Sequence, residues 1–204
     1  MRKFAARGMV MALLALATAG IAATSTAPTA SACSSQENSS AYAATLPQVN
    51  PGDRGAEVKG MQLRLRELGY GLNGTGLYAD NTLSAVKDFQ RKHGINDSGI
   101  VGSKTWQKLV GVLPKFRTEN LWATTPQLNP GDRNPAAVTQ VIDHLMRITD
   151  GEVPGGANGV YDAPLADVVK QFQRQVGIKD SGIVGAKTWH ALSTVVSVRG
   201  NWGC

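Results

Sequence analysis

The sequence of 204 residues is short of the residue types from which most catalytic and metal sites are built. It holds three histidines and two cysteines, and no Cys, His or Glu stands at ligand spacing beside any of the histidines. The histidines, His93, His144 and His190, fall on three different expected helices, where we interpret them as surface or helix-end residues. The sequence therefore predicts no catalytic residue, no metal and no cofactor.

A strong surplus of one charge is also missing. Lys and Arg number 21 against 15 Asp and Glu, a formal net charge of +6. Arg2, Lys3 and Arg7 lie in a segment that we expect to be removed, and dropping three of the 21 bases leaves 18 against 15, or +3. Acids and bases are interleaved, whereas a nucleic-acid-binding protein needs a basic face to neutralise phosphates. We predict no nucleic-acid partner.

Only one long apolar run is present, at residues 9–23, and it follows a basic start and precedes Ala30-Ser31-Ala32. This layout is typical of a secretory signal, here residues 1–32, whereas a membrane anchor needs about 20 apolar residues. We expect a secreted or cell-wall-associated protein with no membrane contact unless Cys33 carries a lipid. Ala30 stands where a lipidation site usually has Leu, Val or Ile, which disfavours the lipid.

The two cysteines, Cys33 and Cys204, are few enough to allow one intramolecular pairing. Because an exported chain meets an oxidising space, we predict a disulfide between them. A lipid on Cys33 and a disulfide between two molecules stay open as alternatives.

Beyond residue 46, the sequence repeats itself. The two copies share three strings, which are Pro-Gln-x-Asn-Pro-Gly-Asp-Arg (47–54 and 126–133), Phe-Gln-Arg (89–91 and 172–174) and Asp-Ser-Gly-Ile-Val-Gly (97–102 and 180–185). Such a repeat indicates two homologous units. The predicted divisions are a flexible lead (33–46), unit one (47–112), a linker (113–125), unit two (126–196) and a C-terminal tail (197–204).

Each unit shows three apolar stripes at helical spacing. In unit one these stripes lie at 58–68, 83–89 and 106–110, and the first two stop at Gly69 and Gly94. Asp80 or Asn81 is the expected N-cap of the second helix, and Ser103 that of the third. In unit two, Asn134 is the expected cap before Pro135. Leu77-Tyr78 and Ile100-Val101 are extended stretches that could pair briefly, and the Asp97 side chain could close a turn. The fold class is all-α, with two tandem three-helix bundles and Gly-rich loops.

Unit one resembles the helical peptidoglycan-binding domain that accompanies the catalytic domains of bacterial cell-wall hydrolases. The matching strings are Gly52-Asp53-Arg54-Gly55, Met61-Gln62, Leu68-Gly69-Tyr70, Gly76-Leu77-Tyr78, Ala85-Val86, Phe89-Gln90 and Thr105-Trp106. In unit two, Ile142 replaces the helix-one Gln and Leu165 replaces the Thr. The resemblance implies binding to peptidoglycan, and unit two lacks the Gln and the Thr of the family pattern.

The residues outside the two units are too few for a hydrolase domain, so we predict a non-catalytic binding protein. A protein that binds sugars and short peptides needs loop amides, hydroxyls and an aromatic face. The candidate ligand-binding residues are Gly76, Tyr78, Asn81, Thr82, Gln90, Gly159, Tyr161 and Gln173. Trp106 and Trp189 are interpreted as core residues. The alternative function is a protein-interaction or regulatory module that docks an exported hydrolase or protease, and such a cell-wall enzyme is a possible partner.

Overall fold

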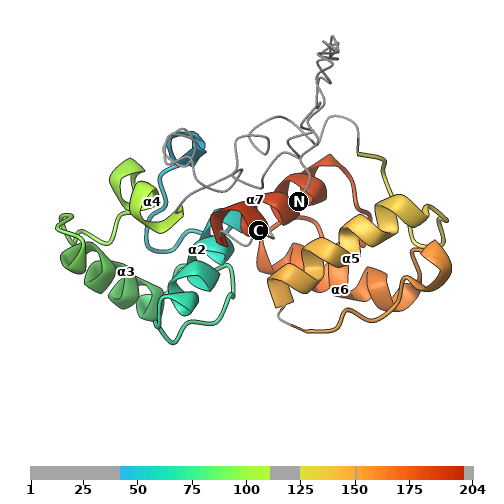
Figure 1. Cartoon of the computed structure of the whole chain (residues 1–204), viewed down its shortest axis with the longest axis horizontal. Coiled ribbons are helices and arrows are strands. Elements are labelled where there is room, and N and C mark those ends of the chain that lie inside the picture. The colour runs from blue at the N-terminus through green and yellow to red at the C-terminus, as the bar shows by residue number, and fades with distance from the viewer. Residues whose placement is uncertain (1–41, 111–124, 150, 200–204) are drawn as a thin grey trace, which may run out of the picture. The chain divides into compact units, whose positions relative to one another are not determined.

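The computed structural model describes residues 42–110, 125–149 and 151–199. This part of the chain is helical, as predicted, and each repeat contains three α-helices (Figure 1). The first repeat holds α2 (Ala56–Glu67), α3 (Asp80–Lys92) and α4 (Ser103–Val110). The second holds α5 (Pro135–Thr149), α6 (Ala163–Gln175) and α7 (Ala186–Arg199), with a 3-10 turn at Ala157–Gly159. The predicted signal, both cysteines and residues 113–124 of the predicted linker lie outside the described residues.

The helix ends follow the sequence signals in part. Gly69, with φ of 92°, follows the end of α2, and Asn134 Oδ1 accepts a hydrogen bond from Ala137 N at 3.1 Å at the start of α5. The predicted caps of α3 and α4 were wrong by one or two positions. Asp80 is the first residue of α3 itself, where its carboxylate still faces the positive end of the helix dipole. Ser103 is likewise the first residue of α4.

Isolated backbone pairs close the loops of each repeat, and no described residue belongs to a strand. In the first repeat, Val49 pairs with Val101 and Arg54 with Leu77. The second repeat has the same two pairs, which are Leu128 with Val184 and Arg133 with Val160. The extended stretches predicted in unit one thus pair with the segment around its Asn-Pro-Gly-Asp string, and this pairing fixes the loops to the start of each bundle.

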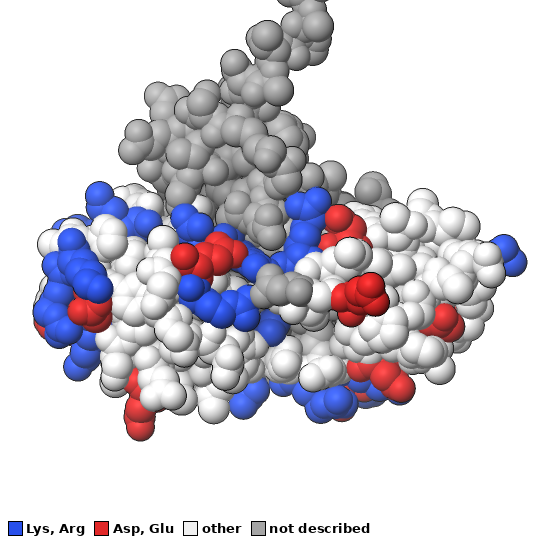
Figure 2. Space-filling view, turned by 60° about the horizontal axis from the view of Figure 1, so that its bottom comes forward, with Lys and Arg blue, Asp and Glu red and all other residues white. Residues whose placement is uncertain are grey.

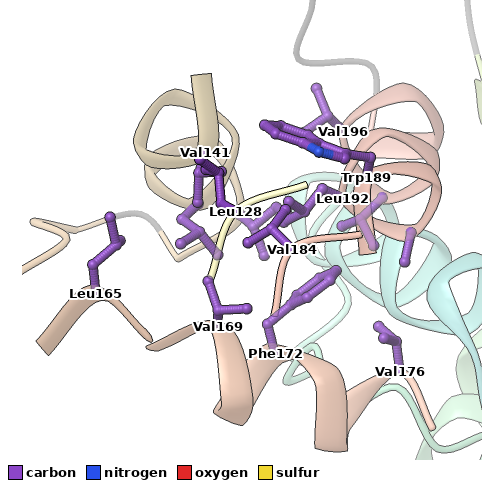
Figure 3. Packing of buried hydrophobic residues seen from close by; sticks show 14 of the residues in the cluster. Leu128, Val141, Leu165, Val169, Phe172, Val176, Val184, Trp189, Leu192 and Val196 are labelled. Atoms are coloured by element: carbon purple, nitrogen blue, oxygen red, sulfur yellow. The ribbon is translucent and has the colours of Figure 1, made fainter. Parts of the chain in front are cut away.

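The core of each repeat is built around a tryptophan. Trp106 and Trp189 are both 0% exposed, which confirms their interpretation as core residues. Their indole Nε1 atoms donate to Pro47 O at 2.8 Å and to Pro126 O at 3.0 Å. Figure 3 shows Trp189 and Leu192 on one side of the second core, facing Val169 and Phe172 of α6. The indole hydrogen bond therefore ties the entry segment of each repeat to its last helix.

The two cores are joined through α7, which packs against α2 of the first repeat as well as against α4 and α5. Ala56 and Leu63 of α2 belong to the core of the second repeat, and Val198 of α7 belongs to the core of the first. Ala56, Gly60 and Leu63 recur at a spacing of four and three residues, so they share one face of α2. This second apolar face is what the sequence reasoning missed in the helix.

Gly60 is the point of closest approach between α2 and α7. A Cβ atom at this position would lie 2.7 Å from Val198 Cβ and 3.3 Å from Val195 Cα. These atoms belong to the body of α7 and not to the flexible end of a side chain, so only glycine fits without moving a helix.

Polar contacts surround this crossing. Arg199 Nε lies 2.6 Å from Glu67 Oε1, and Nη1 of the same guanidinium donates to Arg147 O. On the other side, Arg54 Nη1 donates to Gln175 O at 3.3 Å. Because Arg199 is almost fully buried, its pairing with Glu67 offsets the cost of taking the guanidinium out of water.

Two segments differ from the predicted divisions. Helix α7 continues to Arg199, past residue 196, because Val198 is buried in the core of the first repeat. Residues 42–45, assigned to the flexible lead, form a helical turn with Ala43 fully buried in the same core. Burial of Tyr42, outweighing a side-chain hydrogen bond to Ser197 of α7, raises the pKa of its hydroxyl to about 12.

Lys59 lies beside Gly60 on α2 and is only 5% exposed. Its Nζ donates to Gly74 O at 2.5 Å, and no carboxylate among the described residues lies within 4.0 Å of it. Burial, with smaller contributions from the nearby Arg66 and Arg199 charges, lowers the pKa of Lys59 to about 8. The ammonium form is thus held in the folded chain at a free-energy cost.

We expect Gly60→Ala to lower the free energy of unfolding by about 1–2 kcal/mol, because separating α2 from α7 outweighs the better helix propensity of alanine. Gly151→Ala is the matched control, since nothing lies within 4 Å of a Cβ there, and it should change stability by less than about 0.5 kcal/mol. Urea unfolding measures both variants. Equal stability of the two would show that the crossing tolerates a side chain.

Stability should rise with pH between 7 and 9.5. The pKa of Lys59 is about 10.4 in the unfolded chain and about 8 in the folded chain. In this pH range the unfolded state therefore binds more protons, so stability rises with pH. The gain is about 2 kcal/mol by pH 9.5. Above pH 10, the raised pKa values of buried Tyr78 and Tyr161 act with the opposite sign. Urea unfolding across this range should show the rise in the wild type and a flatter profile in Lys59→Met.

Candidate functional site

The first repeat has a small cavity between the end of α2, the loop that follows it and the start of α3. Its volume is about 140 Å³. Two predicted site residues, Asn81 and Thr82, meet in it. The residues that line it are Gln62, Gly71, Leu72, Asn73, Thr75, Leu77, Ala79, Asn81 and Thr82. The lining carries amides and hydroxyls, and none of the described residues in it has a charged side chain.

Gln62 organises this cavity from below. Its side chain is 1% exposed, and Nε2 donates to Thr82 Oγ1 at 2.9 Å and to Leu77 O at 2.8 Å. Its Oε1 accepts a hydrogen bond from Gly76 N at 2.8 Å. One amide therefore fixes the loop and the start of α3 together. Sequence reasoning left Gln62 out of the candidate residues, although a lone glutamine between apolar positions of a helix was a usable signal.

The side chains on the rim are the ones that a ligand can reach. Asn73, Thr75 and Asn81 are exposed, whereas Thr82 is buried and already accepts from Gln62. The Asn73 and Asn81 amides each carry two donors and an acceptor, which suits the hydroxyl and amide groups of a sugar or a peptide. The cavity thus presents a neutral hydrogen-bonding edge above a buried amide.

Four other predicted site residues lie in the interior. Tyr78 donates its hydroxyl proton to Gly99 O at 2.5 Å, and Gln90 Nε2 donates to Ile100 O at 2.8 Å while its Oε1 accepts from Gly99 N at 3.0 Å. The second repeat copies this arrangement with Tyr161 and Gln173, which hold Gly182 and Ile183. These four side chains are buried, and burial raises the pKa of both tyrosines. Their hydrogen bonds hold the Asp-Ser-Gly loop of each repeat in place.

Gly76 and Gly159 have local reasons to be glycine. Their φ angles are 75° and 70°. A Cβ on Gly76 would collide with Gln175 O of the second repeat, and one on Gly159 would lie 2.6 Å from Pro135 Cγ. Contact of a ligand with either glycine stays a prediction.

The Asp-Ser-Gly turns are closed by serine. Ser98 Oγ accepts from Ile100 N at 3.1 Å, and Ser181 Oγ accepts from Ile183 N at 3.2 Å. Asp97, the expected closing residue, pairs with Arg91 at 3.2 Å instead, because its carboxylate reaches the preceding helix.

The second repeat has replaced the polar core of the cavity. Ile142 stands in place of Gln62, and it packs so close to Gly156 that a Cβ there would collide with its Cδ1. Leu165 stands in place of Thr82 and is buried. The Asp162 carboxylate takes over the loop, because its Oδ2 accepts from Gly156 N at 3.0 Å. The two repeats therefore share a scaffold and differ at the site.

One histidine differs from its sequence interpretation. His144 is 8% exposed, its Nδ1 lies 2.8 Å from Gln140 O and its Nε2 lies 3.3 Å from Ser193 Oγ of α7. It is buried because α5 packs against α7 there. Within the described residues, no group of three or more His, Cys, Asp or Glu could hold a metal ion, and no helix is long and apolar enough to cross a membrane.

Comparisons with known proteins agree with this two-repeat architecture. The family described as "Putative peptidoglycan binding domain" matches twice, at residues 54–109 and 135–192. The chain is 32% identical over 169 residues to a "Probable N-acetylmuramoyl-L-alanine amidase" of Bacillus licheniformis, covering 78% of this chain and 47% of the relative. It is 31% identical to the N-acetylmuramoyl-L-alanine amidase CwlL of the same species, covering 80% of this chain and 49% of the relative.

A shorter match, 38% identical over 69 residues, is to the carboxy-terminal processing protease CtpA of Bacillus subtilis, covering 34% of this chain and 15% of the protease. The chain spans about half the length of the two amidases that it matches. Because the two family matches together take in more than half of its residues, the chain belongs to the peptidoglycan-binding-domain family, with two copies of the domain in tandem.

We expect Gln62→Leu to lower the free energy of unfolding by about 2–3 kcal/mol, because the Gly76 amide and the Thr82 hydroxyl lose a buried partner. The control is Ile142→Leu at the corresponding position of the second repeat, which exchanges one apolar side chain for another and should cost less than about 1.5 kcal/mol. Thermal unfolding and hydrogen exchange of the Gly76 amide measure the two changes. Unchanged exchange at Gly76 in Gln62→Leu would contradict the role given to this amide.

Proposed function

We propose that this chain is an exported, non-catalytic protein that binds peptidoglycan mainly through the cavity of its first repeat. The observation that carries the proposal is the polar cavity edge of Asn73, Thr75 and Asn81 beside the buried Gln62, within a domain of the peptidoglycan-binding family. Export rests on the signal expected at residues 1–32. Association with the cell wall follows from the ligand.

The chemistry of the cavity fits a polymer of sugars and short peptides. Such a ligand offers hydroxyl, acetamido and peptide groups, and each of these can donate to or accept from an asparagine amide. An edge without charged side chains favours these neutral ligand groups over strongly charged ligand groups.

The two repeats should contribute unequally. The second repeat has Ile142 and Leu165 where the first has Gln62 and Thr82, and it has Pro164 where the first has Asn81. A proline ring has no donor to replace the asparagine amide. The second repeat therefore lacks the buried amide of Gln62 and the exposed amide of Asn81, although it still adds avidity on a polymer.

A second candidate function is a regulatory module that docks an exported hydrolase or protease. The observation that favours it is the match to a segment of the processing protease CtpA. In that case the wall would not retain the purified protein, and the cavity edge would serve a peptide segment of the enzyme.

Sedimentation with insoluble, protein-free sacculi tests the proposal. Purified wild-type chain should be found in the pellet, and Asn81→Ala should weaken retention about three- to tenfold, because an exposed amide is lost from the edge without disturbing Gln62. Ser84→Ala, at an exposed position of the same helix, is the control and should bind as the wild type does. Equal retention of Asn81→Ala and Ser84→Ala would show that the binding site does not include Asn81.

The same incubations report on the remaining claims. Sacculi should release no reducing sugar or free amino groups above a boiled control, with or without added zinc, and reproducible release would overturn the non-catalytic assignment. A clean supernatant of wild-type protein at low salt would favour the docking module. The disulfide between Cys33 and Cys204 is also a proposal, and the intact mass before and after reduction decides it.

A further inference from the structure

A second cavity, of about 210 Å³, lies between the two repeats and is separate from the site in the first repeat. One wall is the face of α2 that carries Lys59 and Arg66, and the other walls are the end of α5 and the face of α6 that carries Val168 and Phe172. Its floor is apolar, with Leu63, Ile148 and Phe172, and Gln171 of α6 also lines it. The cavity exists only because the repeats are packed together.

The charge in this cavity is one-sided. Lys59 and Arg66 line it, and Arg199 is close enough to act on the charge of Lys59. Among the residues that the structure describes, no acidic one lines the cavity. Glu67 is engaged by Arg199 and Arg64. Figure 2 shows basic side chains gathered in the middle of one face of the molecule, beside a few acidic ones.

Lys59 is the unusual member of this group. It is more than nine-tenths buried, its ammonium donates to the carbonyl of Gly74, and no carboxylate among the described residues pairs with it. Buried charges in proteins are normally paired, because an isolated one is costly. A lysine held in this way, beside an open cavity whose described lining contains no acid, is organised to receive an anion.

We propose that this cavity binds a terminal carboxylate of a short peptide, with the ammonium of Lys59 facing the carboxylate. The volume equals that of roughly seven liquid waters, which suffices for a carboxylate and the small side chain next to it. The apolar floor would cover a methyl group. A phosphate, which is strongly hydrated and has no apolar part, would leave that floor without a partner.

The proposal deepens the proposed function, since peptides of the cell wall supply such carboxylates, but its test does not depend on sacculi. The probes are acetyl-alanyl-alanine with a free carboxylate, the same peptide as its C-terminal amide, and inorganic phosphate. The Lys59 side-chain signal is followed by NMR in the whole chain and assigned by its loss in Lys59→Met. The expected result is that the free carboxylate raises the pKa of Lys59 from about 8 towards 10.

The variants test the same site through affinity. Lys59→Met should weaken binding of the free-carboxylate peptide at least about tenfold, and Lys179→Met, which removes an exposed lysine of the second repeat, should leave it unchanged. Gln171→Ala should weaken binding severalfold and shows that the second repeat contributes. If Lys59→Met fails to fold, the shift of the Lys59 signal in the wild type decides the question.

Three results would overturn the proposal. These are equal binding of the peptide amide, unchanged affinity in Lys59→Met, and binding of phosphate without binding of the peptide. Sacculi retention that is lost in Asn81→Ala while the carboxylate still shifts Lys59 would separate this site from that of the first repeat. Binding to sacculi without a shift of the Lys59 signal by any probe would contradict this inference and leave the proposed function intact.

Discussion

The crossing of α2 and α7 at Gly60 is the constraint on which the tandem depends. Because no side chain separates the helices there, α7 of the second repeat also completes the core of the first. Val198 of α7 lies in the core of the first repeat, and Leu63 of α2 lies in the core of the second. Two small bundles of this size each bury little apolar surface alone. Sharing a helix gives both of them a larger core, and it is why α7 is buried along most of its length, with polar residues such as Ser193 and Ser197 enclosed.

Within each repeat, buried side-chain amides and hydroxyls bind the backbone groups of the loops, as the backbone pairs of a sheet would in another fold. The long loops have few backbone pairs of their own, so Gln90 and Tyr78 in the first repeat, and Gln173 and Tyr161 in the second, satisfy the loop amides and carbonyls. Such groups are costly to leave unpaired once buried, which makes the network all-or-none. The first repeat adds Gln62 to this network at the cavity, and the second repeat does without it by using Asp162.

Much of this fold was predictable, and the limits have physical causes. Apolar spacing and glycine stops located the helices because those signals are local, and Asn134 was recognised as a cap for the same reason. The burial of the candidate residues Tyr78 and Gln90 was not predictable, since a polar residue next to a loop looks the same in sequence whether it faces the loop or the solvent. The second face of α2 was missed because it consists of only Ala56, Gly60 and Leu63, two of which have little or no side chain, and because their partner helix lies more than 120 residues away in the chain.

The loop between α2 and α3 connects the two cavities. Gly76 N binds Gln62 under the cavity of the first repeat, and two residues earlier Gly74 O accepts from Lys59 in the cavity between the repeats. The Cα of Gly76 also lies against Gln175 O at the end of α6. A carboxylate that competes with Gly74 O for the Lys59 ammonium would release one of the points that hold this loop. Coupling between the proposed sites then requires only that the loop have two arrangements, in which the edge of Asn73 and Asn81 has different affinities for its ligand. Because such coupling is reciprocal, a ligand held at Asn73 and Asn81 would change the affinity of the inter-repeat cavity by the same factor.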